Sequence, residues 1–451
     1  MTLLIQKVQE VWRGYRTELS VFFLVFGVRF AYSLVALMGF GPDSFVSFLD
    51  AEVFVREAYT MLNHGVMSQF LEPPFLPDPL RTPLYLWFLA VLLKLGFSLF
   101  GIVTVQNIGM GIVAVLLYRI GVLLFSDKRI GIFAVTLFAV EPSSVYWSNM
   151  LMSDVLFVFL FMSALYFFTQ KRWYMTALFF GLLTLTRPLG LYLFPVVLIM
   201  TTLNYFHASM TGMRERLQHT GVWPLLKRLM IMVLLFILVV SPWVIRNKVV
   251  FNHAGLSTAG WLNLYIFTVK EFASRRNLPV PMPRVPDEYH PGVYKEVFYN
   301  YEFESAEFFK KHTLDIVKAY PISYAFFHIT SGIQGLHNHD YPYLANYVIA
   351  PLITTKAATL WAHRMEVLGQ GIWWFLYLCV VVGLFKKGKR HWQSFLLGFV
   401  LLNAMLIGYN GVISSGGRYG LPFVPLLLLL AGYGFFFGYD RLKHHFLNSH
   451  V

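Results

Sequence analysis

The sequence contains little of what soluble enzymes and secreted domains normally depend on. It has one cysteine, Cys379, within an apolar stretch, which excludes a disulfide framework and a cysteine metal site. Charged residues make up only 13% of the 451 residues, whereas hydrophobic residues make up 57%. The mean hydropathy is +0.59. Because a soluble domain has too little interior for so much apolar surface, the sequence predicts an integral membrane protein.

Nucleotide-binding motifs are absent as well. The sequence has no Walker loop, no dinucleotide fingerprint and no Gly-x-Ser-x-Gly motif, so neither ATP-driven transport nor a nucleotide-sugar donor is indicated. The net charge of +13 does not indicate nucleic-acid binding, because the basic residues lie in short clusters between apolar runs.

The apolar runs predict an all-α polytopic membrane protein with about ten transmembrane helices. Their expected bounds are Leu19–Phe40, 103–125, 129–149, 152–169, 173–186, 189–205, 228–246, 367–385, 392–412 and 420–438. The first run has a basic flank and no small-residue cleavage site, which predicts a retained anchor instead of a signal peptide.

Residues 83–100 are ambiguous, because their hydropathy also permits a crossing. Lys94 in the middle of the run, and Pro83 at a first helical position, favour a helix that lies at the membrane surface. If this run does not cross, every later basic cluster falls on the side of the basic N-terminus, as the positive-inside rule requires. We therefore expect both termini to be cytoplasmic and residues 41–102 to form an outer loop.

This topology places Asp50 and Asp154 on the same outer side of the membrane. Apolar residues at helical spacing predict an amphipathic surface helix that begins at Asp50 and ends at Gly65. A simple interpretation makes Asp50 the N-cap of that helix and pairs Glu52 with Arg56 at i, i+4. A catalytic role for Asp50 is compatible with capping, so both interpretations stay open.

Four arginines are expected at outer helix ends: Arg81, Arg187, Arg246 and Arg418. Each one alone could extend to the lipid headgroups. Orientation rules disfavour arginine on the outer side, however, and four together suggest a bound anion, for which the planar guanidinium of arginine suits phosphate. Such cations would stabilise the leaving phosphate of a lipid-phosphate-linked sugar, and a nearby carboxylate would serve as base for an acceptor hydroxyl.

The order and spacing of several motifs resemble the GT-C superfamily of membrane glycosyltransferases. The motifs are the Asp50–Gly65 run followed by "RTPLY", "SNMLMSDVLF", "LTRP", "SPWVIRN" and "RYGLPFVP". The likeness is to the branch of the protein O-mannosyltransferases and the lipid A aminoarabinose transferase. This resemblance implies the GT-C fold with juxtamembrane helices in the first outer loop. It also implies inverting transfer of a sugar from a polyprenyl-phosphate donor, at the periplasmic or exterior face of a bacterial inner (plasma) membrane.

The resemblance also assigns roles to residues. It makes Asp50 the catalytic carboxylate, Asp154 the acid that ends the second outer loop and positions the acceptor or the base, and Arg81 the contact to the lipid phosphate. The expected donor-binding group is completed by Arg418, Arg187, Arg246 and Tyr419. The family often has two adjacent acids at the first position. Here Ala51 separates Asp50 from Glu52, so Glu52 is kept as a candidate catalytic residue whose role stays open.

We expect three regions: a GT-C module over 1–246, an extracytoplasmic segment over 247–366 and transmembrane helices over 367–451. The middle segment matches no motif of the family and is the expected place of acceptor choice. A helix is predicted over 303–319, ended by Pro321. Its "LHNHDY" stretch (His337, His339 and Asp340) has ligand-type residues but no further partner at metal-site spacing, so it is interpreted as an outer loop.

No cofactor or metal is predicted, although a divalent ion between Asp50 and Asp154 stays open because some GT-C relatives use one. The expected partners are a polyprenyl-phosphate sugar and an acceptor that is a glycan, a lipid or a protein. The main alternative is a transporter or lipid-linked sugar flippase with an anion site, which should carry acids or broken helices at the membrane midplane. A non-catalytic assembly partner is the third alternative.

Overall fold

The computed structural model describes residues 15–210, 222–286, 299–335, 355–386, 396, 398–400 and 416–448. The regular elements among these residues are all helices. Their order is α2 (Arg16–Phe40), a 3₁₀ turn η1 (Pro42–Val46), α3 (Leu49–His64), α4 (Pro83–Lys94), α5 (Leu99–Phe125), α6 (Lys128–Val140), α7 (Pro142–Ser148), α8 (Ser153–Thr169), α9 (Trp173–Thr186), α10 (Leu189–Met210), α12 (Trp223–Phe251), α13 (Ala259–Asn263), a π-helix η2 (Leu264–Val269), α14 (Lys270–Ser274), α16 (Phe303–Ala319), α17 (Pro321–Gly335), α19 (Thr355–Leu384), α21 (Gly416–Gly420) and α22 (Val424–Asn448).

Five helices in the described part of the chain are long and apolar enough to cross a membrane, or six if α6 and α7 form one bent span. The five are Arg16–Phe40, Leu99–Phe125, Leu189–Phe206, Trp223–Phe251 and His363–Leu384. Helices α8 and α9 coincide closely with the runs 152–169 and 173–186. Both are apolar but shorter than the five helices that are long enough to cross. The membrane class and the helical fold are therefore confirmed, whereas a total of ten crossings stays a prediction. Most of the expected span 392–412 lies outside the described residues.

The expected span 129–149 is two helices, α6 and α7, bent by 61°. Pro142 starts α7 and has no N–H to donate to the Phe138 carbonyl one turn earlier. That carbonyl instead accepts a hydrogen bond from the Arg29 guanidinium of α2 at 3.1 Å. Glu141 caps α7 by accepting from the backbone N–H groups of Ser143 and Ser144. The bend leads the chain into the turn that precedes Asp154.

Helix α4 is too short to cross a membrane. Its twelve residues span about 18 Å, against a hydrocarbon core of about 30 Å. It ends at Lys94, and Gly96 then adopts a positive φ of 82° before α5 begins, capped by Ser98. This agrees with the expectation that 83–100 is not a crossing. The edge of Phe54 in α3 packs against Tyr85 in α4, with ring centroids 5.0 Å apart.

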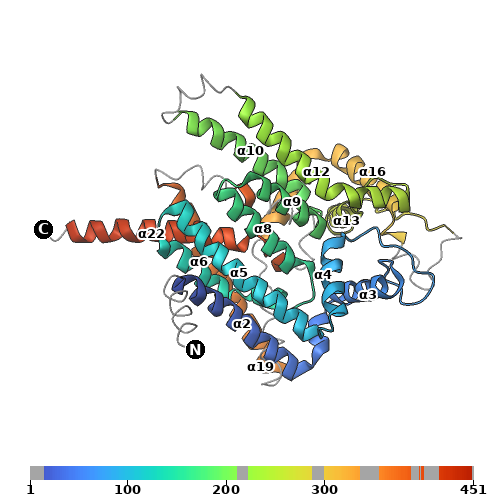
Figure 1. The fold of residues 1–451 in the computed structure, drawn as a ribbon, viewed down its shortest axis with the longest axis horizontal. Coiled ribbons are helices and arrows are strands. Elements are labelled where there is room, and N and C mark those ends of the chain that lie inside the picture. Colours follow the sequence, from blue (N-terminus) through green and yellow to red (C-terminus); the bar gives the residue numbers. More distant parts are fainter. Residues whose placement is uncertain are drawn as a thin grey trace, which may run out of the picture.

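The described parts of 247–366 form a second, smaller apolar cluster beside the first outer loop. Its buried residues include Leu262, Tyr265, Phe272, Phe309 and Tyr324. Helix α16 has the predicted bounds, and α17 follows at Pro321. Figure 1 shows α3, α4, α13 and α16 gathered at one end of the bundle, opposite the end from which α22 projects.

The expected region boundaries, after residues 246 and 366, both fall inside helices. Helix α12 continues to Phe251, and α19 already begins at Thr355. Apolar runs mark where a helix is suited to lipid, but polar residues beyond the run extend the same helix. His337, His339 and Asp340 lie outside the described residues.

Candidate active site

Asp50 lies in the first turn of α3 and is not its N-cap. The N-cap is Phe48, which has extended backbone angles and makes no side-chain capping bond. The Asp50 carboxylate instead accepts from Arg81 Nη2 at 3.3 Å and from Arg418 Nη1 at 2.9 Å. The capping interpretation is therefore wrong, because both carboxylate oxygens face arginines from distant parts of the chain.

The environment of Asp50 favours its ionised form. Partial burial raises the pKa of the carboxyl group, but the charges of Arg418 and Arg81 outweigh that effect and lower the pKa from 3.8 to about 2. The side chain is 40% exposed, in contrast to the buried arginines that hold it. Asp50 is thus an accessible anion between two cations.

Asp154, in the first turn of α8, lies in the same ion-pair network. Arg418 Nε donates to Asp154 Oδ2 at 3.1 Å, and Arg187 pairs with Oδ1. Arg418 therefore joins Asp50 to Asp154, and the prediction that the two acids share one place is confirmed. Asp154 is 0% exposed, however. Its carboxylate contacts Arg187 and Arg418, and its expected role in positioning the acceptor or the base stays a prediction.

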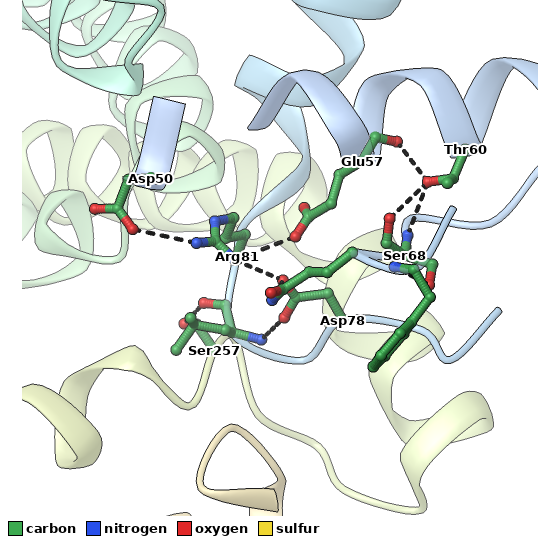
Figure 2. A network of polar contacts seen from close by, with 10 residues as sticks. Asp50, Glu57, Thr60, Ser68, Asp78, Arg81 and Ser257 are labelled. Atoms are coloured by element: carbon green, nitrogen blue, oxygen red, sulfur yellow. Dashed lines mark hydrogen bonds and ion pairs between the residues drawn. The ribbon is translucent and has the colours of Figure 1, made fainter. Parts of the chain in front are cut away.

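Arg81 is the centre of a second cluster, shown in Figure 2. Its Nη1 donates to Glu57 Oε1 at 3.1 Å and to Asp78 Oδ2 at 2.9 Å, while its Nη2 reaches Asp50. The guanidinium also lies 5.2 Å from the ring centre of Phe54. Three carboxyl groups thus converge on one arginine that is only 9% exposed.

Glu57 and Asp78 share this buried space, and their pKa values are shifted in opposite directions. Burial and the adjacent Asp78 charge raise the pKa of Glu57 well above its ordinary value, although Arg81 opposes them. Burial also raises the pKa of Asp78, but hydrogen bonds from Glu57, Gln69 and the Leu80 backbone, together with the Arg81 charge, lower it overall. A protonated Glu57 beside an ionised Asp78 is the arrangement that these partners favour.

Sequence reasoning missed Glu57 and Asp78 as members of the site. A signal existed for both: Asp50, Phe54 and Glu57 recur at i, i+4 and i+7 on one face of α3, and Asp78 precedes Arg81 by three residues. The polar face of α3 resembles a solvated surface in the sequence. Its buried partners, Asp78 and Arg81, come from the loop after the helix, and a hydropathy pattern does not show that this loop folds back onto α3.

Two predicted site residues lie apart from this network. Glu52 is 46% exposed and pairs with Arg56 one turn along α3, which confirms the i, i+4 alternative. Arg246 donates to Asn247 Oδ1 at 2.8 Å and lies over the rings of Trp243 and Phe251. Neither residue lines the cavity described next. Tyr419 does line it, with its ring 5.5 Å from the Arg187 guanidinium and 5.6 Å from that of Arg418.

Asp50 and the arginines open into a cavity of about 360 Å³. One wall carries all the charged lining residues: Asp50, Arg81, Arg187 and Arg418. A second group of lining residues comes from α13, η2 and the segment just before α16. This wall is uncharged and consists of Ala259, Leu262, Asn263, Ile266, Phe267, Asn300 and Tyr301. The volume is in the range of small-molecule sites, on the order of 300–1,000 Å³.

The cavity combines two kinds of group that are needed when a phosphate is the leaving group of a transfer reaction. Three guanidinium groups can neutralise a phosphate anion, and an exposed carboxylate can accept a proton. Within the described residues, no group of three or more His, Cys, Asp or Glu side chains has the arrangement of a metal site.

Part of the chain matches a known protein family. Residues 79–245 match the family described as dolichyl-phosphate-mannose-protein mannosyltransferase. This confirms the family resemblance for a stretch that holds Arg81, Asp154 and Arg187. A comparison with curated protein sequences found no match.

Among solved structures, the chain is similar to the crystal structure of ArnT from Cupriavidus metallidurans bound to undecaprenyl phosphate. The two are 15% identical, and the match covers 90% of this chain and 76% of that one with a TM-score of 0.36. This score is too low for positions in the two structures to be equated.

Proposed function

We propose that this protein is a membrane glycosyltransferase that moves a sugar from a polyprenyl-phosphate carrier to an acceptor hydroxyl on the extracytoplasmic side. The observation that carries the proposal is the exposed Asp50 carboxylate held between Arg81 and Arg418 at the wall of a cavity. The family matched by residues 79–245 supports it, since its description names a dolichyl-phosphate sugar as donor.

The arginines act on the leaving group. When the bond between the anomeric carbon and the phosphate oxygen breaks, the lipid phosphate keeps the bonding electrons as an anion. Arg81, Arg187 and Arg418 are buried to different degrees in one wall, where a fixed cation stabilises developing charge far more than it does in water. The phosphate therefore needs no general acid to depart.

Asp50 acts as the base on the acceptor hydroxyl. Its two oxygens accept hydrogen bonds from Arg81 and Arg418, which makes it a weak base. A phosphate that binds these same arginines competes for their N–H groups and adds negative charge nearby. Both effects raise the basicity of Asp50, so donor binding prepares the base. The acceptor then attacks in line from the side opposite the phosphate, with inversion at the anomeric carbon.

Asp154 positions two of the arginines. It is fully buried, with one oxygen on Arg187 and the other on Arg418. Its charge partly offsets theirs, and it fixes the direction in which each guanidinium presents its remaining N–H groups.

The proposal is tested in membranes of a strain from which the gene has been deleted. Mass spectrometry of lipids, polymers and proteins should show one glycan missing, and the wild-type gene should restore it. A gene encoding Asp50→Asn should not restore it, whereas Glu52→Gln should. Full restoration by Asp50→Asn, at equal protein level in the membrane, would contradict the proposal.

A further inference from the structure

The uncharged cavity wall has no assigned role, although it makes up a large part of the lining. It is built by α13 and η2, which carry Asn263 and Phe267, and by Asn300 and Tyr301 just before α16. These elements belong to the segment that follows α12, outside the stretch matched by the family.

Two side-chain amides on this wall lack partners. Neither Asn263 nor Asn300 makes a side-chain hydrogen bond to another residue that the structure describes, although both line the cavity. An amide offers two N–H donors and a carbonyl acceptor, and groups of that kind at a half-buried surface need partners when water is displaced. The amides are therefore available to a ligand.

Aromatic rings line the same cavity as these amides. Phe267 and Tyr301 line the same wall, and Tyr419 and Phe54 line the cavity beside the arginines. Rings of this kind pack against the C–H face of a sugar, while amides bond its hydroxyl groups. A phosphate held at Arg81 and Arg418 would place the sugar it carries within the cavity that these residues line.

We propose that Asn263 and Asn300, with the rings of Phe267 and Tyr301, form the subsite that binds the ring of the transferred sugar, and that this sugar carries no ionised group. The described lining of that wall contains no charged side chain. Asp50, the carboxylate in the described lining, is already paired with Arg81 and Arg418, so an ammonium group on the sugar would find no free carboxylate and would share the cavity with three arginines. A carboxylate on the sugar would add a second anion beside the lipid phosphate and Asp50. This inference rests on the proposed function, because it assumes a lipid-phosphate sugar at the arginines.

The test is equilibrium binding to the purified full-length protein of a synthetic polyprenyl phosphate. The lipid is used bare, or carrying glucose, mannose, galactose, aminoarabinose or glucuronic acid. At least one neutral sugar should increase affinity over the bare lipid, and the two charged sugars should not. Asn263→Ala and Asn300→Ala should each reduce that increase by about three- to tenfold, the loss of one or two hydrogen bonds, and leave the bare lipid unaffected. Asn63→Ala, at an exposed position of α3 outside the cavity, is the matched control.

The outcomes separate this inference from the proposed function. If bare polyprenyl phosphate binds but no neutral sugar adds affinity, or if both asparagine variants keep the full increase, the sugar subsite is wrong and the phosphate site stands. Preference for aminoarabinose or glucuronic acid over every neutral sugar also overturns it. If the wild type does not bind even the bare lipid, the proposed function itself fails.

Discussion

Asp50 and Glu57 lie two turns apart on α3 and both contact Arg81, yet their surroundings shift their pKa values in opposite directions. Asp50 is partly exposed and receives a second arginine, Arg418, so its pKa falls to about 2. Glu57 is fully buried and shares one arginine nitrogen with Asp78, so burial and the Asp78 charge raise its pKa. The difference shows that position in the cluster, and not residue type, separates an available carboxylate from a neutral structural one.

The largest expected effect is that of Asp50→Asn. The amide keeps the shape of the side chain but cannot accept the acceptor proton, so single-turnover transfer should fall by about 10²–10⁴-fold. Glu52→Gln, two residues along the same helix, is the control. A turnover rate within a few-fold of wild type for Asp50→Asn would remove Asp50 from the chemistry and end the contrast with Glu57.

Arg81→Ala should have the next largest effect, because it removes the cation that both acids share. Losing one donor to a developing anion costs about 10²–10³-fold in rate, and here donor affinity should fall as well. Arg81→Lys should recover only part of the loss, since lysine keeps the charge without the planar fork. Binding and single-turnover rates are measured on the same purified variants. Unchanged donor affinity in Arg81→Ala would move the phosphate site to Arg187 and Arg418.

Glu57→Ala should destabilise the protein by about 1–3 kcal/mol, because Arg81 and Asp78 lose a buried hydrogen-bonding partner. Glu57→Gln should be milder, since an amide resembles the protonated acid. Thermal unfolding in detergent measures both. If Glu57→Gln proves as damaging as Glu57→Ala, an ionised Glu57 is required and the contrast with Asp50 is wrong.

The pH dependence of stability should separate Glu57 from its glutamine variant. The folded-state pKa of Glu57 lies above its ordinary value of 4.5. Its contribution is therefore fully present below that ordinary value and is lost as pH rises through the raised folded-state value. The melting temperature of the wild type should fall over that window relative to Glu57→Gln, and a constant difference between the two would contradict a raised pKa.

Glu52→Gln should have the smallest effect. Its partner Arg56 is on the exposed surface of α3, and an exposed i, i+4 ion pair contributes about 0.2–0.5 kcal/mol. Transfer and donor binding should match the wild type. A loss of transfer comparable to that of Asp50→Asn would restore Glu52 as a catalytic residue.

Local patterns predicted much of the site. Helical spacing and Gly65 predicted the end of α3. The distribution of basic residues predicted that 83–100 does not cross the membrane, and therefore that Asp50 and Asp154 lie on the same side. Those patterns could not show that Arg418 bridges the two acids, because 264 residues separate Arg418 from Asp154 in the chain. Nor could they show the burial of Glu57, which depends on the 68–81 loop folding over a polar helix face. The break at Pro142 was missed because the apolar run continues across it while the helix axis turns.

The most direct test of the division of roles is donor affinity in Asp50→Asn. Asp50 accepts hydrogen bonds from N–H groups of Arg81 and Arg418 that a phosphate would also use, and its charge repels a phosphate. Equilibrium binding of a polyprenyl-phosphate sugar to purified Asp50→Asn should therefore be as tight as in the wild type or tighter, while single-turnover transfer is lost. If Asp50→Asn instead loses donor affinity to the same extent as Arg81→Ala, Asp50 serves only to hold the arginines, and its role as the base is contradicted.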